Sequence, residues 1–323
     1  MLKKIAVLTS GGDAPGMNAC IRAVVRTAIF HKLEVIGITR GYDGMINHEF
    51  IPLNTKSVAN IIQRGGTILK TARSQEFLKL GGRRKAKENL EKHNIEGVVA
   101  IGGDGTFRGA LEFSKICNIP FVGCPGTIDN DLFGTDFTIG YDTAINTVVE
   151  AVDKIRDTAE SHDRLFFVEV MGRDAGLIAL RSGIGSGAEA ILISEAKTDF
   201  NKLIKHLREG RKDKNSKIVI VSEQKGTGSV LSIAEKVKKE LPFYDIRVSV
   251  LGHIQRGGNP TCMDRVISSR MGFSAVEALL NGKKNVMIGI MNNKITYTPF
   301  NKAVKHLEGI HPDLERMMRI LAV

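Results

Sequence analysis

The chain has 323 residues, 42% of them hydrophobic, which is enough for two ordinary domains with packed cores, so a disordered protein is not expected. Its formal net charge of +11 admits a nucleic-acid binder, a membrane-surface protein or an enzyme whose substrates carry phosphate. The basic residues are scattered, Trp is absent and no nucleic-acid module is recognisable, so we expect neither a nucleic-acid nor a membrane partner.

The cysteines and the N-terminus indicate a compartment. The cysteines show no CxxC or zinc spacing and lie in apolar stretches, which is typical of a reducing environment. They are Cys20, Cys117, Cys124 and Cys262. The N-terminal apolar run is too short for a secretory signal, and no stretch approaches the roughly 18 apolar residues of a membrane span. We therefore expect a soluble cytoplasmic protein.

Short runs rich in β-branched residues alternate with helix-like segments along the chain. The predicted strands are 4–10, 34–39, 97–103, 120–126, 165–172, 190–195, 217–223 and 246–252. This alternation is typical of βαβ units, so the predicted fold class is α/β, with mostly parallel sheets flanked by helices. So many strands favour two lobes facing each other over one sheet.

Glycines and polar residues follow most of these strands. In a parallel sheet the ligand lies beyond the carboxyl ends of the strands, so we expect these segments to line a site. They are residues 11–16, 102–106, 125–131, 171–176, 223–228 and 253–258.

Two of these segments, "SGGDAPG" (10–16) and "GGDGT" (102–106), form glycine loops between a strand and a helix. Such loops leave backbone N–H groups bare for phosphate. Neither matches a Walker A or GxGxxG pattern, and a plain turn is the alternative for each. An aspartate among phosphate-facing amides is repulsive without a cation, so Asp104 is predicted to be a ligand of magnesium on a nucleotide.

The segment "PGTIDND" (125–131) places Asp129 and Asp131 two residues apart. On one face of an extended loop, one carboxylate can accept a proton from a hydroxyl while the other helps to hold the metal. An Asx-turn is the structural alternative.

Phosphoryl transfer also needs cations around the moving group and the acceptor. Strand alternation over 247–253 places Arg247 and His253 on one face, with Arg256 just beyond. Arginine matches phosphate oxygens well, so the acceptor is predicted to carry phosphate already. The available cations are Arg73, Arg164, Arg173, Arg247, His253 and Arg256.

Together the motifs "LTSGGDAPGMNA", "IGGDGT", "PGTIDNDL", "VEVMGR" and "VLGHIQRGG" resemble bacterial ATP-dependent 6-phosphofructokinases along nearly the whole chain. NAD kinases and lipid kinases resemble it only at "GGDGT". A nucleotide-sensing module without chemistry is the non-enzyme alternative, and Asp129 argues against it, because a binder gains nothing from a carboxylate beside an acceptor hydroxyl.

The resemblance implies transfer of the terminal phosphoryl group of MgATP to the 1-hydroxyl of fructose 6-phosphate, a committed step of glycolysis, with Mg²⁺ as cofactor. It also implies a homotetramer whose active sites are shared between subunits. The implied ATP-binding lobe is 1–139 plus about 254–304, and the sugar-phosphate-binding lobe is 140–253 plus about 305–323.

By motif position, the resemblance assigns roles to individual residues. Asp129 matches the general base, Thr127 a transition-state contact and Asp131 a metal-linked carboxylate, with Arg173 also catalytic. Arg164 and Arg247 match arginines that reach in from a neighbouring subunit. The nucleotide side comprises Gly12, Tyr42, Arg73, Ser74, Gly103, Asp104, Gly105, Thr106 and Gly109, with Asp104 at the metal. The sugar-phosphate side comprises Thr127, Asp129, Arg164, Met171, Gly172, Arg173, Glu223, Arg247, His253 and Arg256.

The phosphoryl donor follows from two glycines. Related pyrophosphate-dependent enzymes carry Asp at the position of Gly105 and Lys at that of Gly126. We expect both glycines to leave space for the α-phosphate of ATP. A pyrophosphate-dependent enzyme or another sugar-phosphate kinase, such as one accepting sedoheptulose phosphate, is the alternative.

The resemblance also implies a site for ADP activation and phosphoenolpyruvate inhibition. Arg22 and Arg26 share a helix face, and an exposed amphipathic face is the alternative for such a pair. The chain departs from the pattern at Thr55, Asn60 and Ser216, so we expect ADP activation to be weakened. The implied effector residues are Arg22, Arg26, Arg156, Glu189, Lys212 and Lys214.

Overall fold

A computed structural model describes residues 2–162, 164–193, 195, 199–209, 217–223, 229–305 and 312–321. The chain folds into two compact units. The first unit is Met1–Thr143 with Arg256–Leu307, and the second unit is Ala144–Gln255 with Glu308–Val323. That these units correspond to an ATP-binding and a sugar-phosphate-binding lobe stays a prediction.

The first unit is built on a sheet that has seven strands within the described residues, in the order β11-β10-β5-β4-β1-β2-β3. The central strands pair in parallel, whereas the edge strands β3 and β11 are antiparallel to their neighbours. The strands are β1 (Lys4–Ser10), β2 (Glu34–Ile38), β3 (Phe50–Leu53), β4 (Gly97–Gly102), β5 (Phe121–Pro125), β10 (Val286–Met291) and β11 (Lys294–Pro299).

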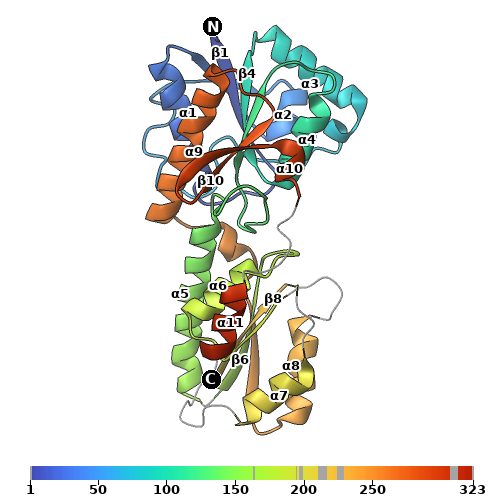
Figure 1. Cartoon of the computed structure of the whole chain (residues 1–323), viewed down its shortest axis with the longest axis vertical. Coiled ribbons are helices and arrows are strands. Elements are labelled where there is room, and N and C mark those ends of the chain that lie inside the picture. Colours follow the sequence, from blue (N-terminus) through green and yellow to red (C-terminus); the bar gives the residue numbers. More distant parts are fainter. Residues whose placement is uncertain are drawn as a thin grey trace. The chain divides into compact units, whose positions relative to one another are not determined.

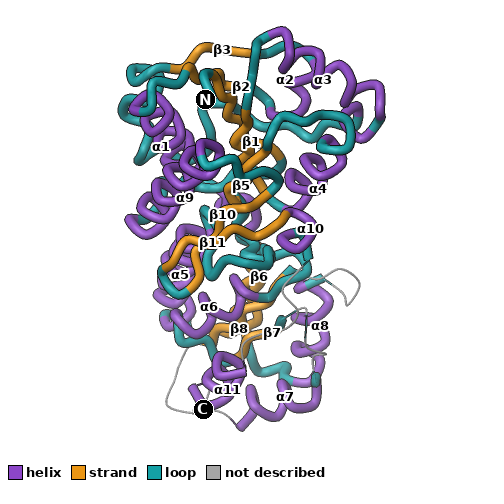
Figure 2. Tube along the Cα trace, turned by 45° about the horizontal axis from the view of Figure 1, so that its top comes forward, coloured by secondary structure: helices purple, strands orange, loops and turns teal. Residues whose placement is uncertain are grey.

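Helices cover both faces of this sheet, as Figure 1 and Figure 2 show. The helices α1 (Met17–Phe30) and α9 (Cys262–Leu280) pack together on one face. The other face is covered by α2 (Gly41–Ile46), α3 (Leu80–Lys92), α4 (Asp104–Phe113) and α10 (Phe300–Ala303), with the short 3₁₀ helix Glu76–Leu78 beside them. Because β1 and β4 are buried on both faces, their sequences are continuous apolar runs.

The second unit has a parallel sheet in the order β7-β8-β6-β9. Its strands are β6 (Arg164–Val170), β7 (Ala190–Leu192), β8 (Lys217–Ser222) and β9 (Asp245–Val250). Buried apolar residues of α7 (Phe200–Glu209) and α8 (Val230–Glu240) pack on one face. The remaining helices are α5 (Tyr141–Glu160), α6 (Leu177–Gly185), which contacts β7 and β8, and α11 (Pro312–Leu321), which contacts α6; the 3₁₀ helix Gly252–Arg256 follows β9.

The predicted fold class is confirmed, and each of the eight predicted strands is present to within a few residues. Strands β3, β10 and β11 were not predicted. The edge strands β3 and β11 are short or half-exposed and lack a continuous apolar run. The hairpin was recognisable, because "VMIGIM" in β10 is a continuous apolar run and the following Asn292 and Asn293 tolerate the positive φ that both adopt in a two-residue turn between β10 and β11.

The four cysteines differ in burial. Cys20, Cys117 and Cys124 are buried, whereas Cys262, the first residue of α9, is exposed. No helix in the described part of the chain is both long and apolar enough to cross a membrane.

A buried carboxylate in the first unit joins the starts of α9 and α5. Asp264 is fully buried and accepts hydrogen bonds from the backbone N–H groups of Gly140 and Thr143, each at 2.8 Å, and from the Thr143 hydroxyl. Thr261 caps α9 by accepting from the Asp264 N–H at 3.2 Å, and its hydroxyl donates to Asp142 at 2.6 Å. Burial raises the pKa of Asp264 from 3.8 to about 6.

We predict that this carboxylate makes stability depend on pH. Because the pKa of Asp264 is higher in the folded protein, that protein binds the proton more tightly, and the free energy of unfolding falls as pH rises from about 4 to about 6. The loss is about 3 kcal/mol for a shift of this size. In Asp264→Asn this slope should be missing, which urea unfolding of both proteins from pH 4 to pH 7 would measure. Equal slopes in the two proteins would contradict the assignment.

Candidate active site

The two glycine loops meet at the topological switch point of the first sheet. Strands β1 and β4 are neighbours, with Ser10 opposite Gly102 at their carboxyl ends. The chain leaves β1 into α1 and β4 into α4, and these two helices lie on opposite faces of the sheet (Figure 1). Such a crevice is where open α/β sheets bind ligands.

Thr106 ties the two loops together. Its hydroxyl donates to the carbonyl oxygen of Ser10 at 3.1 Å, and a Cβ at Gly11 would lie 3.7 Å from the same hydroxyl. A Cβ at Gly102 would overlap it. The Thr106 hydroxyl therefore helps to hold the two loops together, while the Thr106 N–H donates to the carbonyl oxygen of Gly103 at 3.0 Å.

Arg256 lies against the first glycine loop. A Cβ at Gly12 would overlap the guanidinium group of Arg256, so a larger residue at position 12 would require that side chain to shift. Arg256 also donates to the carbonyl oxygen of Asp13 at 3.2 Å. Arg256, which is predicted to contact the sugar phosphate, therefore lies beside the loop that is predicted to bind the nucleotide.

Asp104 is the first residue of α4, and its side chain is 22% exposed. It forms an ion pair with Arg108, one helical turn later, at 3.7 Å. Magnesium bound with a nucleotide needs one or two carboxylates, the phosphates supplying the other oxygens. The partly exposed carboxylate of Asp104 fits this requirement, whereas no group of three His, Cys, Asp or Glu side chains in the described residues could hold a metal alone.

Three further predicted nucleotide residues, Tyr42, Ser74 and Gly109, lie on the α2 side of the sheet. Tyr42 is buried, donates to the carbonyl oxygen of Thr106 at 2.6 Å and stacks on Phe77, and burial raises its pKa. A Cβ at Gly109 would lie 2.8 Å from the Tyr42 ring, so this glycine makes room for the tyrosine. Ser74 accepts from the Phe77 N–H at 3.3 Å. Arg73, which precedes Ser74 in the chain and is also predicted to contact the nucleotide, is exposed.

The loop after β5 adjoins the second glycine loop. The Gly126 N–H donates to the carbonyl oxygen of Gly102 at 3.0 Å, and a Cβ at Gly103 would lie 3.6 Å from the Cβ of Thr127. The Thr127 hydroxyl accepts from the Asp129 N–H at 3.2 Å, and Asp129 is only 3% exposed. The buried carboxylate of Asp129 therefore lies in a loop that adjoins the glycine loop predicted to bind the nucleotide.

The expectation of an extended loop is wrong at one residue. Asn130 adopts a left-handed backbone, with φ of 53°, so the chain turns between Asp129 and Asp131. The alternation that would place both carboxylates on one face holds only for extended chain. Asp131 is nevertheless buried in the same loop.

The two glycines of the donor argument differ in their surroundings. A Cβ at Gly105 would meet no atom within 4 Å, as expected. A Cβ at Gly126 would lie 2.8 Å from the methyl group of Met17 and 3.3 Å from the backbone nitrogen of Gly102. The expected open space at Gly126 is thus wrong, because α1 packs against it.

In the second unit, the loop after β6 is held by two neighbouring segments. The Arg173 N–H donates to the Glu223 carboxylate at 2.8 Å, and the Met171 N–H donates to the Gln255 side chain at 3.2 Å. Gly172 and Arg173 both have positive φ. These contacts bring together Met171, Gly172, Arg173 and Glu223 at the carboxyl ends of β6 and β8. Gln255 was missed, although it lies inside the "GHIQRGG" motif.

The expected shared strand face of Arg247 and His253 is wrong. Strand β9 ends at Val250, and His253 lies exposed in the following 3₁₀ helix, so strand alternation does not extend to it. Arg247 instead shares Asp245 with Arg164, at 3.1 Å and 2.7 Å. The Arg164 hydrogen bond lowers the pKa of Asp245, and Arg247 adds to the shift. Arg164 begins β6, at the opposite end of this sheet from Met171–Arg173.

The predicted effector residues fall into separate groups. Arg22 and Arg26 lie four residues apart on α1 and so share a helix face, as predicted, and burial together with the charge of Arg26 lowers the pKa of Arg22. In the second unit, Arg156 donates to the carbonyl oxygen of Ser186, and Glu189 is buried with its carboxylate accepting from the Ile218 N–H. The remaining predicted positions, Lys212, Lys214 and Ser216, lie outside the described residues.

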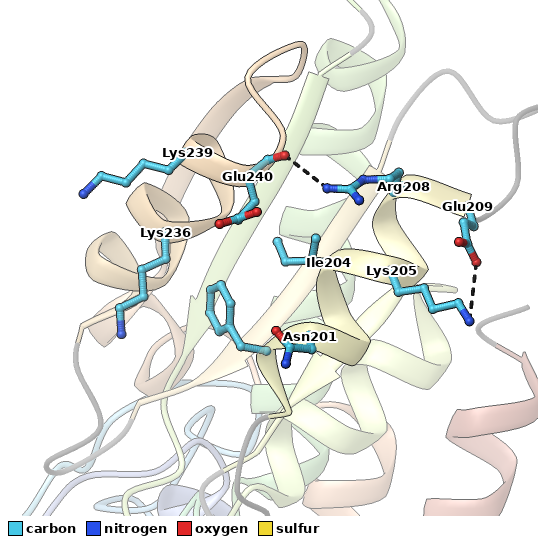
Figure 3. Close-up of a pocket in the computed structure, with 9 residues that line it drawn as sticks. Asn201, Ile204, Lys205, Arg208, Glu209, Lys236, Lys239 and Glu240 are labelled. Carbon is cyan, nitrogen blue, oxygen red and sulfur yellow. Dashed lines mark hydrogen bonds and ion pairs between the residues drawn. The ribbon is translucent and has the colours of Figure 1, made fainter.

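A pocket of about 620 Å³ opens between α7 and α8 (Figure 3) and contains none of the predicted site residues. Its basic residues outnumber its acidic ones, but Lys205 pairs with Glu209 at 3.9 Å and Arg208 donates to the carbonyl oxygen of Glu240 at 3.4 Å. This pattern is typical of solvated helix faces.

Comparisons with known proteins agree with the motifs. A model of the family described as "Phosphofructokinase" matches residues 4–279. The ATP-dependent 6-phosphofructokinase of Cytophaga hutchinsonii is 57% identical over 314 residues, covering 97% of this chain and 96% of that protein. The ATP-dependent 6-phosphofructokinase 1 of Thermus thermophilus is 54% identical over 323 residues, covering 100% of both.

The fold also matches a solved structure. The T-state phosphofructokinase of Pichia pastoris is similar with a TM-score of 0.86 and 38% identity over 94% of this chain. The chain spans 35% of the length of that Pichia chain.

Proposed function

The chain belongs to the phosphofructokinase family, and on this premise we propose that it transfers the terminal phosphoryl group of ATP to the 1-hydroxyl of fructose 6-phosphate. The observation that carries the proposal is the buried Asp129 in a loop hydrogen-bonded to the second glycine loop. Relatives that match the full chain are named ATP-dependent 6-phosphofructokinases. The products are fructose 1,6-bisphosphate and ADP, as in the committed step of glycolysis.

In the proposed reaction, the 1-hydroxyl oxygen forms a bond to the terminal phosphorus, and the bond from that phosphorus to the leaving ADP oxygen breaks. Asp129 accepts the hydroxyl proton. Backbone N–H groups of the glycine loops at 11–12 and 103–105, together with the start of α4, bind the phosphates. Thr127 and Arg173 stabilise the charge on the moving group.

Mg²⁺ is the proposed cofactor, held by Asp104 together with the nucleotide phosphates. When bound, it neutralises charge on the transferred group. Asp131, buried two residues after the base, is the proposed second carboxylate linked to the metal.

Contacts with the sugar phosphate are assigned to the second unit and to Arg256. The hydrogen bond from Arg173 to Glu223 supports a preformed loop at the carboxyl ends of β6 and β8. Arg164 and Arg247 are proposed to serve the site of a neighbouring subunit in a homotetramer. Their position at the other end of this sheet supports that assignment.

Regulation by ADP and phosphoenolpyruvate is also proposed. Clustered guanidinium groups at Arg22 and Arg26 suit an anionic effector. We predict that phosphoenolpyruvate inhibits, whereas ADP restores little activity, because Thr55 removes a positive charge from the pattern of the family. Thr55→Arg should strengthen the ADP response, as measured by ADP titration of the inhibited enzyme. Full activation of wild type at low ADP would contradict this prediction.

The proposed compartment is the cytoplasm, since Cys20, Cys117, Cys124 and Cys262 are free thiols.

The decisive test is fructose 1,6-bisphosphate formation from fructose 6-phosphate with Mg²⁺ and either ATP or pyrophosphate as donor. Activity with ATP alone supports the donor and the acceptor together. Activity with pyrophosphate would overturn the donor assignment, and inactivity with both would overturn the proposed function.

A further inference from the structure

We propose that Asn130 is the positioning residue that sets the conformation of the loop carrying Asp129, acting through Thr138. This inference rests on the proposed function, because the loop matters only if Asp129 is the base. Asn130 lies between the two carboxylates of "PGTIDND". Its side-chain hydrogen bonds are made with the segment 136–138, which follows the loop.

Both polar groups of the Asn130 side chain are used. Its oxygen accepts from the Thr138 N–H at 2.7 Å, and its amide donates to the carbonyl oxygen of Asp136 at 3.1 Å. The residue is only 7% exposed, so water cannot easily replace these partners. A short side chain that offers a donor and an acceptor together is a property of asparagine that aspartate and glycine lack.

Thr138 closes the other side of the loop. Its hydroxyl donates to the carbonyl oxygen of Thr127 at 2.6 Å, and its side chain is almost fully buried. The next residue, Ile139, donates from its N–H to the carbonyl oxygen of Pro125 at 2.8 Å. The stretch from Thr127 to Asn130 is therefore attached at both ends to the segment 136–138, with Asp129 between the two attachments.

The backbone of Asn130 adds a second constraint. Its φ of 53° lies in the left-handed region, which asparagine and glycine tolerate and most other residues avoid. The turn at Asn130 therefore sets the direction of the chain between Asp129 and Asp131. Side chain and backbone thus set the loop by independent means, and the two can be separated by mutation.

The experiment uses Asn130→Gly, which keeps the left-handed backbone and removes the side chain. A misplacement of about 1 Å can cost about 10²-fold in rate, so we expect kcat to fall by between about tenfold and about 10²-fold. The KM for ATP should stay within about twofold, because the side chain of Asn130 bonds to the segment 136–138. Asn94→Gly, an exposed asparagine with φ of 54°, is the matched control and should leave both constants unchanged.

The Thr138 pair tests the same loop without changing Asn130. Thr138→Val removes the hydroxyl that supports Thr127 and should lower kcat, whereas Thr138→Ser keeps it and should restore kcat. The Asn130→Gly/Thr138→Val double variant should lose less than the product of the two single losses, because both act on one loop. Hydrogen exchange of the Thr138 amide should be faster in Asn130→Gly than in wild type.

Several outcomes would overturn the inference. An unchanged kcat in Asn130→Gly would do so, as would a kcat lost equally in Thr138→Val and Thr138→Ser. A loss explained by a parallel fall in melting temperature would assign Asn130 a purely structural role. An inactive wild type would instead overturn the proposed function, so the two failures are distinguishable.

Discussion

Asp129→Ala will lower kcat by about 10³-fold, within the range by which a positioned general base accelerates a reaction. Asp129 is buried in the loop after β5, and its N–H donates to the hydroxyl of Thr127. Asp129→Asn should lose as much, because an amide of the same size cannot accept the hydroxyl proton. The measurement is steady-state kinetics with ATP, Mg²⁺ and fructose 6-phosphate.

The matched control is Asp153→Asn, which removes one negative charge at an exposed position of α5, outside the predicted site. It should keep the wild-type kcat. In the Asp129 variants the KM for ATP should change little, because the carboxylate acts on the acceptor. A fall in kcat of less than tenfold in Asp129→Asn, with the control unaffected, would remove Asp129 from the role of base.

Gly105→Asp should lower kcat/KM for ATP by about 10²-fold or more, since opposing like charges costs several kcal/mol. Gly105 lies in the first turn of α4, and a Cβ there would meet no atom within 4 Å. The fold should therefore tolerate the substitution, and a carboxylate near a helix N-terminus is itself stabilising. Kinetics with ATP and a melting temperature would separate lost binding from lost folding.

The matched variant is Gly105→Asn, which has nearly the same volume and no charge. If repulsion dominates, Gly105→Asn should retain much more activity with ATP than Gly105→Asp. Equal losses would mean that crowding decides the donor. Wild-type kinetics with ATP in Gly105→Asp would end the donor argument. We expect neither variant to gain activity with pyrophosphate. Related pyrophosphate-dependent enzymes also carry Lys at the position of Gly126, and Gly126 is packed against Met17 here.

The sequence alone determined the fold class, the strands with continuous apolar runs other than β10, and the loops that follow β1, β4 and β5. These features are local: a strand buried on both faces must be apolar throughout, and a loop that approaches phosphate must be rich in glycine. Asp104 and Asp129 were therefore found as candidates before any contact was known. The short edge strands carried weaker signals and were missed.

Only the tertiary structure decided how the candidate residues are supported. The turn at Asn130, the packing of Met17 against Gly126 and the guanidinium of Arg256 over Gly12 each depend on neighbours from other elements. Asp264 likewise finds its partners more than 100 residues away, at Gly140 and Thr143. Local pattern indicates which side chains can do chemistry, but contacts between distant segments set their burial and partners, because these arise only when the sheet and helices pack.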